Sequence, residues 1–293
     1  MACSNSCVTS NSQIPELLAV QRCSGGLEVG AATRIAEFID LLEDSGPSKD
    51  EPVAQALADH LKKLAAGHVR NWGSIGGNLV MAQQLAFESD IATILLGAGA
   101  SVKVVTVGSH EGSGTHSVSS LTLEEFLSKG ALGEFSLLQS VFVPLDESIR
   151  GSDSGRTIFK TFRGAPRPFG NAVSYANAAF LAEVVSGAHS KQQGNCVIGS
   201  VRLAFGAFGT KHAIRAVRVE KHLTGKLLTP QLVLECVELL KKEIVPREGT
   251  TKAEFRVSLA VAFLFEFLNP LVSSEPDVAP ASLVSSFTAM WQP

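Results

Sequence analysis

Apolar and polar positions repeat along this chain with the periods of both strands and helices. Alternating or β-branched runs, which are typical of strands, occur at residues 27–30, 101–107, 137–143, 157–162 and 197–208. Apolar residues at helical spacing occur at residues 35–42, 53–64, 121–129, 213–223, 230–244 and 252–268. Residues 171–185 are ambiguous, because their alanines suit a helix as well as a strand that pairs with the last run. The pattern predicts an α+β protein without internal repeats.

Capping signals mark where several of these helices begin. Thr33 is expected to cap the first helix through its hydroxyl group. Thr122 and Glu125 have the spacing of a capping box, and Thr229 stands before a proline in a first turn. The last helix, at 252–268, carries apolar residues on both sides. It is therefore predicted to be buried.

The length of 293 residues fits one or two domains. A polar stretch with Gly and Ser at 144–155 is the expected boundary between them. This division predicts a first domain at 14–150 and a second at 151–270. A polar leader at 1–13 is expected to be disordered, and the tail at 271–293 to be loosely held.

Composition and charge exclude several classes of protein. Hydrophobic residues make up 45% of the chain, which is enough for a core and excludes disorder as the overall state. The 25 Lys+Arg against 28 Asp+Glu form no basic run, which argues against a nucleic-acid partner. The most apolar stretch, at 259–272, is interrupted by Glu266, Asn269 and Pro270, so no membrane span is predicted.

The cysteines favour a reducing compartment. They lack a C-x-x-C pair or histidines at ligand spacing, and they stand at Cys3, Cys7, Cys23, Cys196 and Cys236. Cys196 and Cys236 lie in apolar patterns and are expected to be buried, inert thiols. Residues 1–13 have neither the apolar core of a secretory signal nor the arginines of a transit peptide. A cytoplasmic location is predicted.

The densest candidate for chemistry is the segment RNWGSIGGN at residues 70–78. Gly73, Gly76 and Gly77 permit positive φ, so successive N–H groups can form a nest around one phosphate. A tight structural turn between a helix and a strand explains the same glycines. The spacing is neither a Walker nor a Rossmann motif, and the residues alone leave both interpretations open.

Two charged residues add to this candidate site. Ser89 and Asp90 place a hydroxyl and a carboxylate at a helix start, although capping alone also explains Asp90. Lys160 shares a strand face with Ile158 and Phe162, where an amine costs free energy unless it snorkels or meets an acceptor. An edge position in the sheet explains Lys160 equally well.

Other polar groups give weaker signals. The loop RGAPRP at 163–168 is basic and stiffened by proline, so it can clamp an anion or be a solvated loop. The seven histidines are scattered without an H-E-x-x-H motif, and no G-x-S-x-G elbow is present. Neither a metal site nor a serine nucleophile is predicted.

Taken together, these segments resemble a known family. HVRNWGSIGGNLVMA at 68–82 and SDIATILL at 89–96 closely resemble the flavin-binding segment of the aldehyde oxidase and xanthine dehydrogenase family of molybdenum hydroxylases. IPEL at 14–17 and LEVGA at 27–31 continue the match, which extends over residues 14–268.

A second set of motifs narrows the resemblance to the plant aldehyde oxidases. These motifs are FKTFR at 159–163, APRP at 165–168 and GNA at 170–172. The region 83–88 differs from xanthine dehydrogenases. Descent from a xanthine dehydrogenase is therefore less expected than descent from an aldehyde oxidase.

The resemblance implies a fold and a cofactor. The first domain would be part of an FAD-binding domain of the p-cresol methylhydroxylase type, a mixed or antiparallel sheet with helices. The second would resemble the C-terminal domain of carbon monoxide dehydrogenase flavoproteins, a three-stranded antiparallel sheet with a helix bundle. In that family FAD receives electrons from two iron–sulfur clusters and passes them to oxygen or NAD, while a molybdopterin domain oxidises the aldehyde.

The resemblance also assigns cofactor contacts to particular residues. They are the phosphate and ribityl loop at Ser74, Ile75, Gly76, Gly77 and Asn78, the acid Asp90, Leu138 beside the cofactor, and Lys160 near the isoalloxazine ring. A cation at that last position can stabilise reduced, anionic flavin. No catalytic residue is assigned.

Several family features are missing from the sequence. Residues 1–13 cannot replace the V-G-N-T-like loop that grips the FAD pyrophosphate, and neither clustered iron–sulfur cysteines nor a molybdopterin domain is present. We therefore expect a truncated flavoprotein module that binds FAD weakly without this loop and does not oxidise aldehydes alone.

Two alternatives remain at this point. The chain could be a non-catalytic remnant or interaction protein that no longer binds FAD, or a fragment of a full oxidase. Its expected partners are FAD and either a second copy or iron–sulfur and molybdopterin subunits, with no nucleic acid or membrane.

Overall fold

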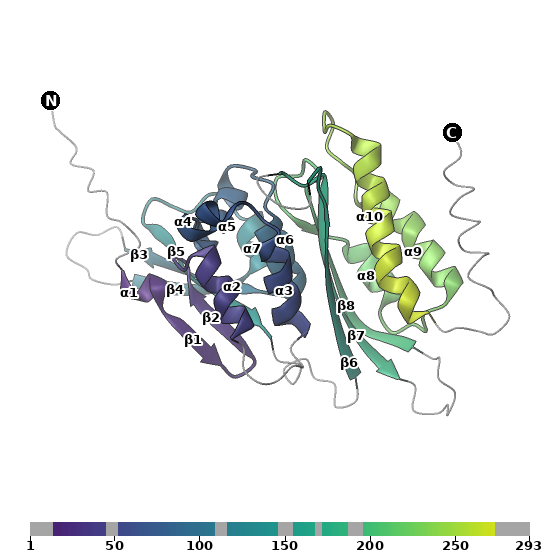
Figure 1. Ribbon diagram of the computed structural model, residues 1–293, viewed down its shortest axis with the longest axis horizontal. Coiled ribbons are helices and arrows are strands. Elements are labelled where there is room, and N and C mark those ends of the chain that lie inside the picture. The colour runs from purple at the N-terminus through teal and green to yellow at the C-terminus, as the bar shows by residue number, and fades with distance from the viewer. Residues whose placement is uncertain are drawn as a thin grey trace.

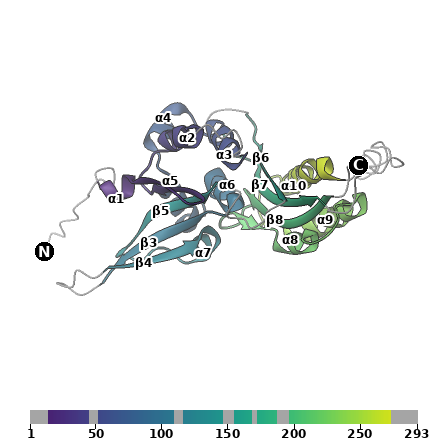
Figure 2. The same ribbon diagram turned by 90° about the horizontal axis from the view of Figure 1, so that it is seen from below.

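The structure is a computed structural model that describes residues 14–44, 52–108, 116–145, 155–167, 172–186 and 196–272. Its elements form successive layers: a first sheet, a group of helices, a second sheet, and three C-terminal helices (Figures 1 and 2). This arrangement confirms the predicted α+β class with two sheets.

The first sheet is antiparallel throughout. Its five strands follow the order β1 (Val20–Cys23), β2 (Gly26–Gly30), β5 (Ser136–Pro144), β3 (Ser101–Val107) and β4 (His116–Thr122). Leu27 and Val29 of β2 point into the core, because alternate strand residues face opposite sides. Glu28 points the other way and accepts a hydrogen bond of 2.7 Å from both Lys103 Nζ and Ser140 Oγ. One face of the sheet is thus left for packing against helices.

The helices around this sheet are short. They are α1 (Pro15–Leu18), α2 (Ile35–Glu43), α3 (Pro52–Lys62), α4 (Gly67–Trp72), α5 (Ile75–Gln84), α6 (Asp90–Ala98) and α7 (Leu123–Ser128). The predicted capping box of α7 is confirmed, since Glu125 N–H donates to Thr122 Oγ1 at 3.2 Å and Thr122 N–H to the Glu125 carboxylate at 2.8 Å.

The second sheet carries the C-terminal helices on one face. Its strands follow the order β6 (Gly155–Gly164), β7 (Ala176–Ser186), β8 (Cys196–Gly206) and β9 (Ile214–Arg215). The helices are α8 (Val217–Leu223), α9 (Pro230–Glu243) and α10 (Ala253–Leu268), followed by the short 3-10 helix η3 (Asn269–Leu271). Phe180 packs between Phe162, Phe205 and Phe267, with ring centroids 5.0–5.4 Å apart.

The ambiguous segment at 171–185 forms strand β7 in its described part. Ala178 and Ala182 face the core under the C-terminal helices, whereas Ala179 faces the core of the first sheet. Small side chains fit because helices pack on both faces of this strand. The sequence could not show this, since burial on both faces removes the alternation that identifies a strand.

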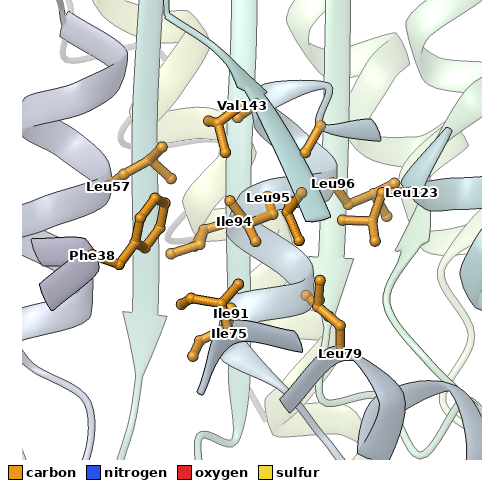
Figure 3. Close-up of a cluster of buried hydrophobic side chains, with 14 of the residues drawn as sticks. Phe38, Leu57, Ile75, Leu79, Ile91, Ile94, Leu95, Leu96, Leu123 and Val143 are labelled. Atoms are coloured by element: carbon orange, nitrogen blue, oxygen red, sulfur yellow. The ribbon is translucent and has the colours of Figure 1, made fainter. Parts of the chain in front are cut away.

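Helix α6 lies between the two sheets. Every residue from Ile91 to Ala98 is buried, and Figure 3 shows Ile91, Ile94 and Leu96 pointing into different parts of the surrounding core. A Cβ on Gly97 would stand 2.5 Å from both Cβ and O of Ala179. The contact between α6 and β7 therefore depends on a glycine at this position.

Two predicted helix starts were wrong. Thr33 does not cap α2; the cap is Arg34, and the carbonyl oxygen of Thr33 instead accepts from Ile75 N–H at 3.0 Å. The predicted helix at 213–223 begins only at Val217, because Ile214 and Arg215 first pair with β8. The second sheet consequently has a short fourth strand beyond the three expected.

Other predictions of local structure are confirmed or only partly met. Thr229 caps α9, since its Oγ1 accepts from Leu232 N–H at 3.2 Å. Helix α10 is buried over its C-terminal half, but Phe255 in its first turn is exposed. Most of the 144–155 boundary, the leader and the tail beyond Val272 lie outside the described residues. Within the described ranges, no helix has the length and apolar content needed to cross a bilayer.

The close approach at Gly97 predicts a stability effect. Gly97→Ala should lower the free energy of unfolding by about 1–3 kcal/mol, because the added methyl group forces α6 away from β7. Urea unfolding followed by circular dichroism measures the change. Gly67→Ala is the matched control in helix α4, where a Cβ meets nothing within 4 Å. Equal losses of stability in the two variants would contradict the conclusion that the contact between α6 and β7 requires a glycine at position 97.

Candidate functional site

The glycine-rich segment forms the start of helix α5. Ser74 caps this helix, because its Oγ accepts from Gly77 N–H at 3.1 Å. Gly76 N–H donates to the carbonyl oxygen of Ala31 at 2.8 Å, and Ile35 N–H donates to that of Gly73 at 2.9 Å. The segment is thereby fixed against residues 31–35, which lead into the first residue of α2.

The structure meets neither interpretation of the glycine-rich segment, the backbone nest or the turn between a helix and a strand. Gly73, Gly76 and Gly77 do not have positive φ, and the last two lie inside α5 instead of in a turn before a strand. Their N–H groups, and that of Ile75, already donate within the protein. The cause is the Ser74 cap, which brings the glycines into the first helical turn.

These glycines serve close packing instead. A Cβ on Gly76 would stand 2.5 Å from Ala31 Cβ, and one on Gly77 would stand 2.9 Å from Ser74 Oγ. Small residues here let the start of α5 approach both the preceding loop and any bound molecule.

Two cavities meet at the start of α5. The larger has a volume of about 590 Å³ and is lined by both apolar and polar side chains. The residues that line it include Ile35, Leu64, Val69, Ser74, Gly77, Asn78, Met81, Phe87, Glu88, Asp90, Arg163, Ala172, Val173 and Ser174. The smaller, about 400 Å³, is lined by residues that include Ile14, Leu17, Ala31, Ser74, Gly76, Gly77 and Leu138. Ser74 and Gly77 border both cavities.

The structure brings most of the predicted site residues together. Asn78 and Asp90 line the larger cavity, and Gly76 and Leu138 line the smaller one. Ile75 is the exception in the loop, since its side chain is fully buried in the core (Figure 3). Its assignment to the cofactor through the resemblance stays a prediction.

Lys160 lies apart from both cavities. It is on β6, at the edge of the second sheet, and pairs with Phe180 of β7. Alternation places it on the face of Phe162, which packs in the core under the C-terminal helices. Lys160 is not among the described residues that line either cavity. Its role beside the flavin remains a prediction from the resemblance.

Asp90 is held by a network that joins α6 to the second sheet. Arg163 Nε donates to Asp90 Oδ2 at 3.1 Å, and Ser174 Oγ donates to Asp90 Oδ1 at 2.7 Å. Asn177 Nδ2 also donates to Oδ1. Capping belongs to Ser89, whose Oγ accepts from Ala92 N–H at 2.9 Å. The carboxylate therefore connects the two halves of the structure.

Ser174 and Asn177 were missed from the sequence. They lie in or beside the ambiguous segment at 171–185, and a lone Ser or Asn carries no motif. A long-range contact to Asp90, which is more than 80 positions away in the chain, left no signal in a single sequence.

The comparisons with known proteins identify the family. Residues 5–146 match the FAD binding domain in molybdopterin dehydrogenase, and residues 160–271 match the CO dehydrogenase flavoprotein C-terminal domain. The chain therefore carries the FAD binding domain of molybdopterin dehydrogenases and the CO dehydrogenase flavoprotein C-terminal domain. This confirms the resemblance drawn from residues 68–82 and 89–96.

Curated relatives of this flavoprotein are much longer. An indole-3-acetaldehyde oxidase of Zea mays is 44% identical over 270 residues, which cover 92% of this chain and 18% of the relative. An aldehyde oxidase-like protein of Oryza sativa subsp. japonica is 47% identical over 262 residues, covering 88% of this chain and 19% of its own length. The chain thus spans about a fifth of the length of these two relatives.

Solved structures share the fold. Quinoline 2-oxidoreductase from Pseudomonas putida aligns with a TM-score of 0.64 and 22% identity, covering 89% of this chain and 80% of that one. Carbon monoxide dehydrogenase from Hydrogenophaga pseudoflava aligns with a TM-score of 0.65 and 20% identity, covering 87% and 78%. The chain therefore shares its fold with these two solved structures.

In the described parts of the chain, no group of three or more His, Cys, Asp or Glu residues is placed so that it could hold a metal ion. Burial raises the pKa of the Cys236 thiol to about 12, with a smaller effect from Glu235. Cys196 is only half-buried, and burial raises its pKa as well. Both raised pKa values make the thiols poor nucleophiles, but the prediction that Cys196 is buried was wrong.

A buried histidine lies beside the Asp90 network. His60 of α3 is 1% exposed, and its Nε2 has no hydrogen-bond partner among the described residues. Burial lowers the pKa of His60 from 6.5 to about 4; Asp90 opposes this shift, whereas Arg163 and Lys63 add to it. His60 is therefore neutral in the folded flavoprotein near pH 7.

His60 predicts a loss of stability in acid. The unfolded chain binds a proton near pH 6.5 and the folded chain only near pH 4, so stability falls as the pH drops through this window. The loss from this group is on the order of 3 kcal/mol. Unfolding of His60→Leu at several pH values should show a shallower pH dependence than the native protein. The exposed His68, changed to Leu, is the control and should leave the slope as it is.

Proposed function

We propose that this chain binds FAD at the two cavities around the start of α5 and acts as a flavin module of an aldehyde oxidase-like molybdenum hydroxylase. The observation that carries the proposal is the position of the matched flavin segment. Ser74, Gly77 and Asn78 of that segment border cavities large enough for parts of a cofactor.

The larger cavity suits the flavin ring. Apolar side chains such as Ile35, Leu64 and Phe87 can cover a planar aromatic body. Ser74 Oγ has a proton to donate, and Asn78 Nδ2 has no partner among the described residues, since only its Oδ1 accepts from Ser89. When bound, FAD supplies reversible electron acceptance. The residues of the chain would hold it, orient it and exclude water.

The phosphates have fewer partners than the ring. Arg163 is the one cationic side chain among the described residues lining the cavities, and it is already bonded to Asp90. What remains is the positive end of the α5 dipole, which attracts anions without binding them tightly. We expect most of the affinity to come from the ring and ribityl chain.

The rest of the proposed reaction lies outside this chain. The names of the longer relatives describe aldehyde oxidation, and we propose that iron–sulfur and molybdopterin centres on other segments or subunits supply that chemistry. The flavin module would then accept electrons from them, and it would not oxidise aldehydes by itself.

Ser74 supplies the first test. Ser74→Ala should weaken FAD binding about tenfold, because it removes both the α5 cap and a hydroxyl donor at the meeting point of the cavities. Titration followed by flavin fluorescence and absorbance measures the affinity. Ser117→Ala, on the exposed strand β4, is the control and should bind as the native protein does. A colourless protein without FAD affinity at tens of micromolar would refute the proposal.

Riboflavin, which lacks the phosphates and adenosine of FAD, tests which part of the cofactor provides the binding affinity. If the ring and ribityl chain provide most contacts, riboflavin and FAD should bind within about tenfold of one another. FAD binding that is far tighter would show that phosphate-binding groups exist which the cavities do not reveal.

An interaction protein is the second candidate function. Large apolar side chains are exposed near the larger cavity, with Trp72 85%, Leu85 71% and Val173 64% exposed. We expect such a protein, free of FAD, to self-associate through these residues. Light scattering checks this, and Leu85→Lys should restore the monomer. A monomer at all concentrations in the native protein would count against this candidate.

A further inference from the structure

Protein donors occupy most of the Asp90 carboxylate. Arg163 lies 3.1 Å from Oδ2, Ser174 Oγ lies 2.7 Å from Oδ1 and 3.0 Å from Oδ2, and Asn177 adds a further donor. The Asp90 side chain is only 12% exposed. A carboxylate offers about four lone-pair sites, so little capacity is left for a ligand.

Arg163 extends this contact to a wall of the larger cavity. While Nε bonds Asp90, Nη2 donates to the carbonyl oxygen of Ala172 and Nη1 to that of Arg167 at 3.4 Å. The Arg163 side chain is 6% exposed. Ala172, with the two residues that follow it, lines the cavity. One guanidinium thus fixes both α6 and the wall at 172–174.

The opposite wall comes from a different part of the fold. Val69, Ser74 and Met81, on or beside α4 and α5, line that side. Between the two walls, Asp90 and Arg163 form an ion pair that joins the two parts.

We propose that Arg163 is a positioning residue for the flavin site, and that Asp90 acts through Arg163 instead of touching the cofactor. Asp90 and Arg163 form a latch that holds the wall at 172–174 against α4 and α5. This inference rests on the proposed flavin binding. An ion pair that merely stabilises the fold is the competing explanation.

Arg163→Lys separates these explanations. Lysine keeps the positive charge beside Asp90, but its compact ammonium cannot bond Asp90 and Ala172 at once in the geometry of the planar guanidinium. The latch predicts FAD binding at least tenfold weaker, in a protein shown by circular dichroism to be folded. Arg156→Lys, at an exposed position on the same strand, is the control and should bind normally. Normal binding by Arg163→Lys would overturn the proposal.

A double-mutant cycle tests the part assigned to Asp90. Asp90→Ala and Arg163→Ala should each weaken FAD binding, and the double variant should be no weaker than the worse single variant. Effects that multiply would show that Asp90 contacts the flavin directly and would overturn the latch. If these variants do not fold, Ser174→Ala replaces them, because it removes one donor and leaves the ion pair. It should weaken FAD binding about threefold, and no change would count against the latch.

Amide hydrogen exchange tests the latch without flavin. Peptides that cover residues 172–186 should exchange at least tenfold faster in Arg163→Lys than in the native protein or Arg156→Lys. Native exchange in Arg163→Lys would overturn the latch even if FAD binds. A native protein that binds no flavin, but shows this faster exchange in the variant, would refute the proposed function and leave the latch established.

Discussion

The burial of helix α6 on all sides is the constraint on which the rest of the structure depends. Its residues pack toward the first sheet through Ile94 and Leu95 and against β7 through Gly97. The core of the first sheet also includes Ala179 and Leu181 from the second. Burial of apolar area is the main favourable term in folding. The two halves therefore share a core, and any cavity between them is shaped by both.

Ion pairs also hold the two halves of the structure together, and their charges are arranged in the same way each time. Among the described residues, three ion pairs join the halves, and in each an acid of the first half meets an arginine of the second. These pairs are Glu88–Arg256, Asp90–Arg163 and Glu124–Arg215. Arginine suits such positions because its planar fork bonds several acceptors at once; Arg256, for example, also donates to the carbonyl oxygen of Tyr175 at 2.8 Å. A buried charge left without its partner costs several kcal/mol, so these pairs favour one arrangement of the two sheets over others.

Sequence patterns predicted several elements that turn one face to solvent, but they left strand β7 ambiguous and missed β9. Alternation and helical spacing found β2, α2, α3 and α9, because each turns a polar side to solvent. Strand β7 escaped because both faces are buried, and β9 because a two-residue strand carries no period. Thr33 shows the limit of capping rules: its sequence suits a cap, but its backbone is drawn to the start of α5. Tertiary contacts of this kind override local preference, and no single sequence records them.

The candidate site shows the same division between local and long-range information. Ser74, Gly77 and Asn78, which the resemblance assigns to the cofactor, line one cavity. The physical argument for a nest of N–H groups failed, because the donors are bonded to residues 31–35 and to the Ser74 cap. An anion near this helix can be attracted by its dipole and by hydroxyl and amide side chains, and not by a row of free backbone donors. At the proposed flavin site, recognition would then depend on shape and apolar contact more than on phosphate charge. Arg163 of β6 lines the larger cavity together with the glycine-rich segment, so the second sheet also contributes to the proposed site.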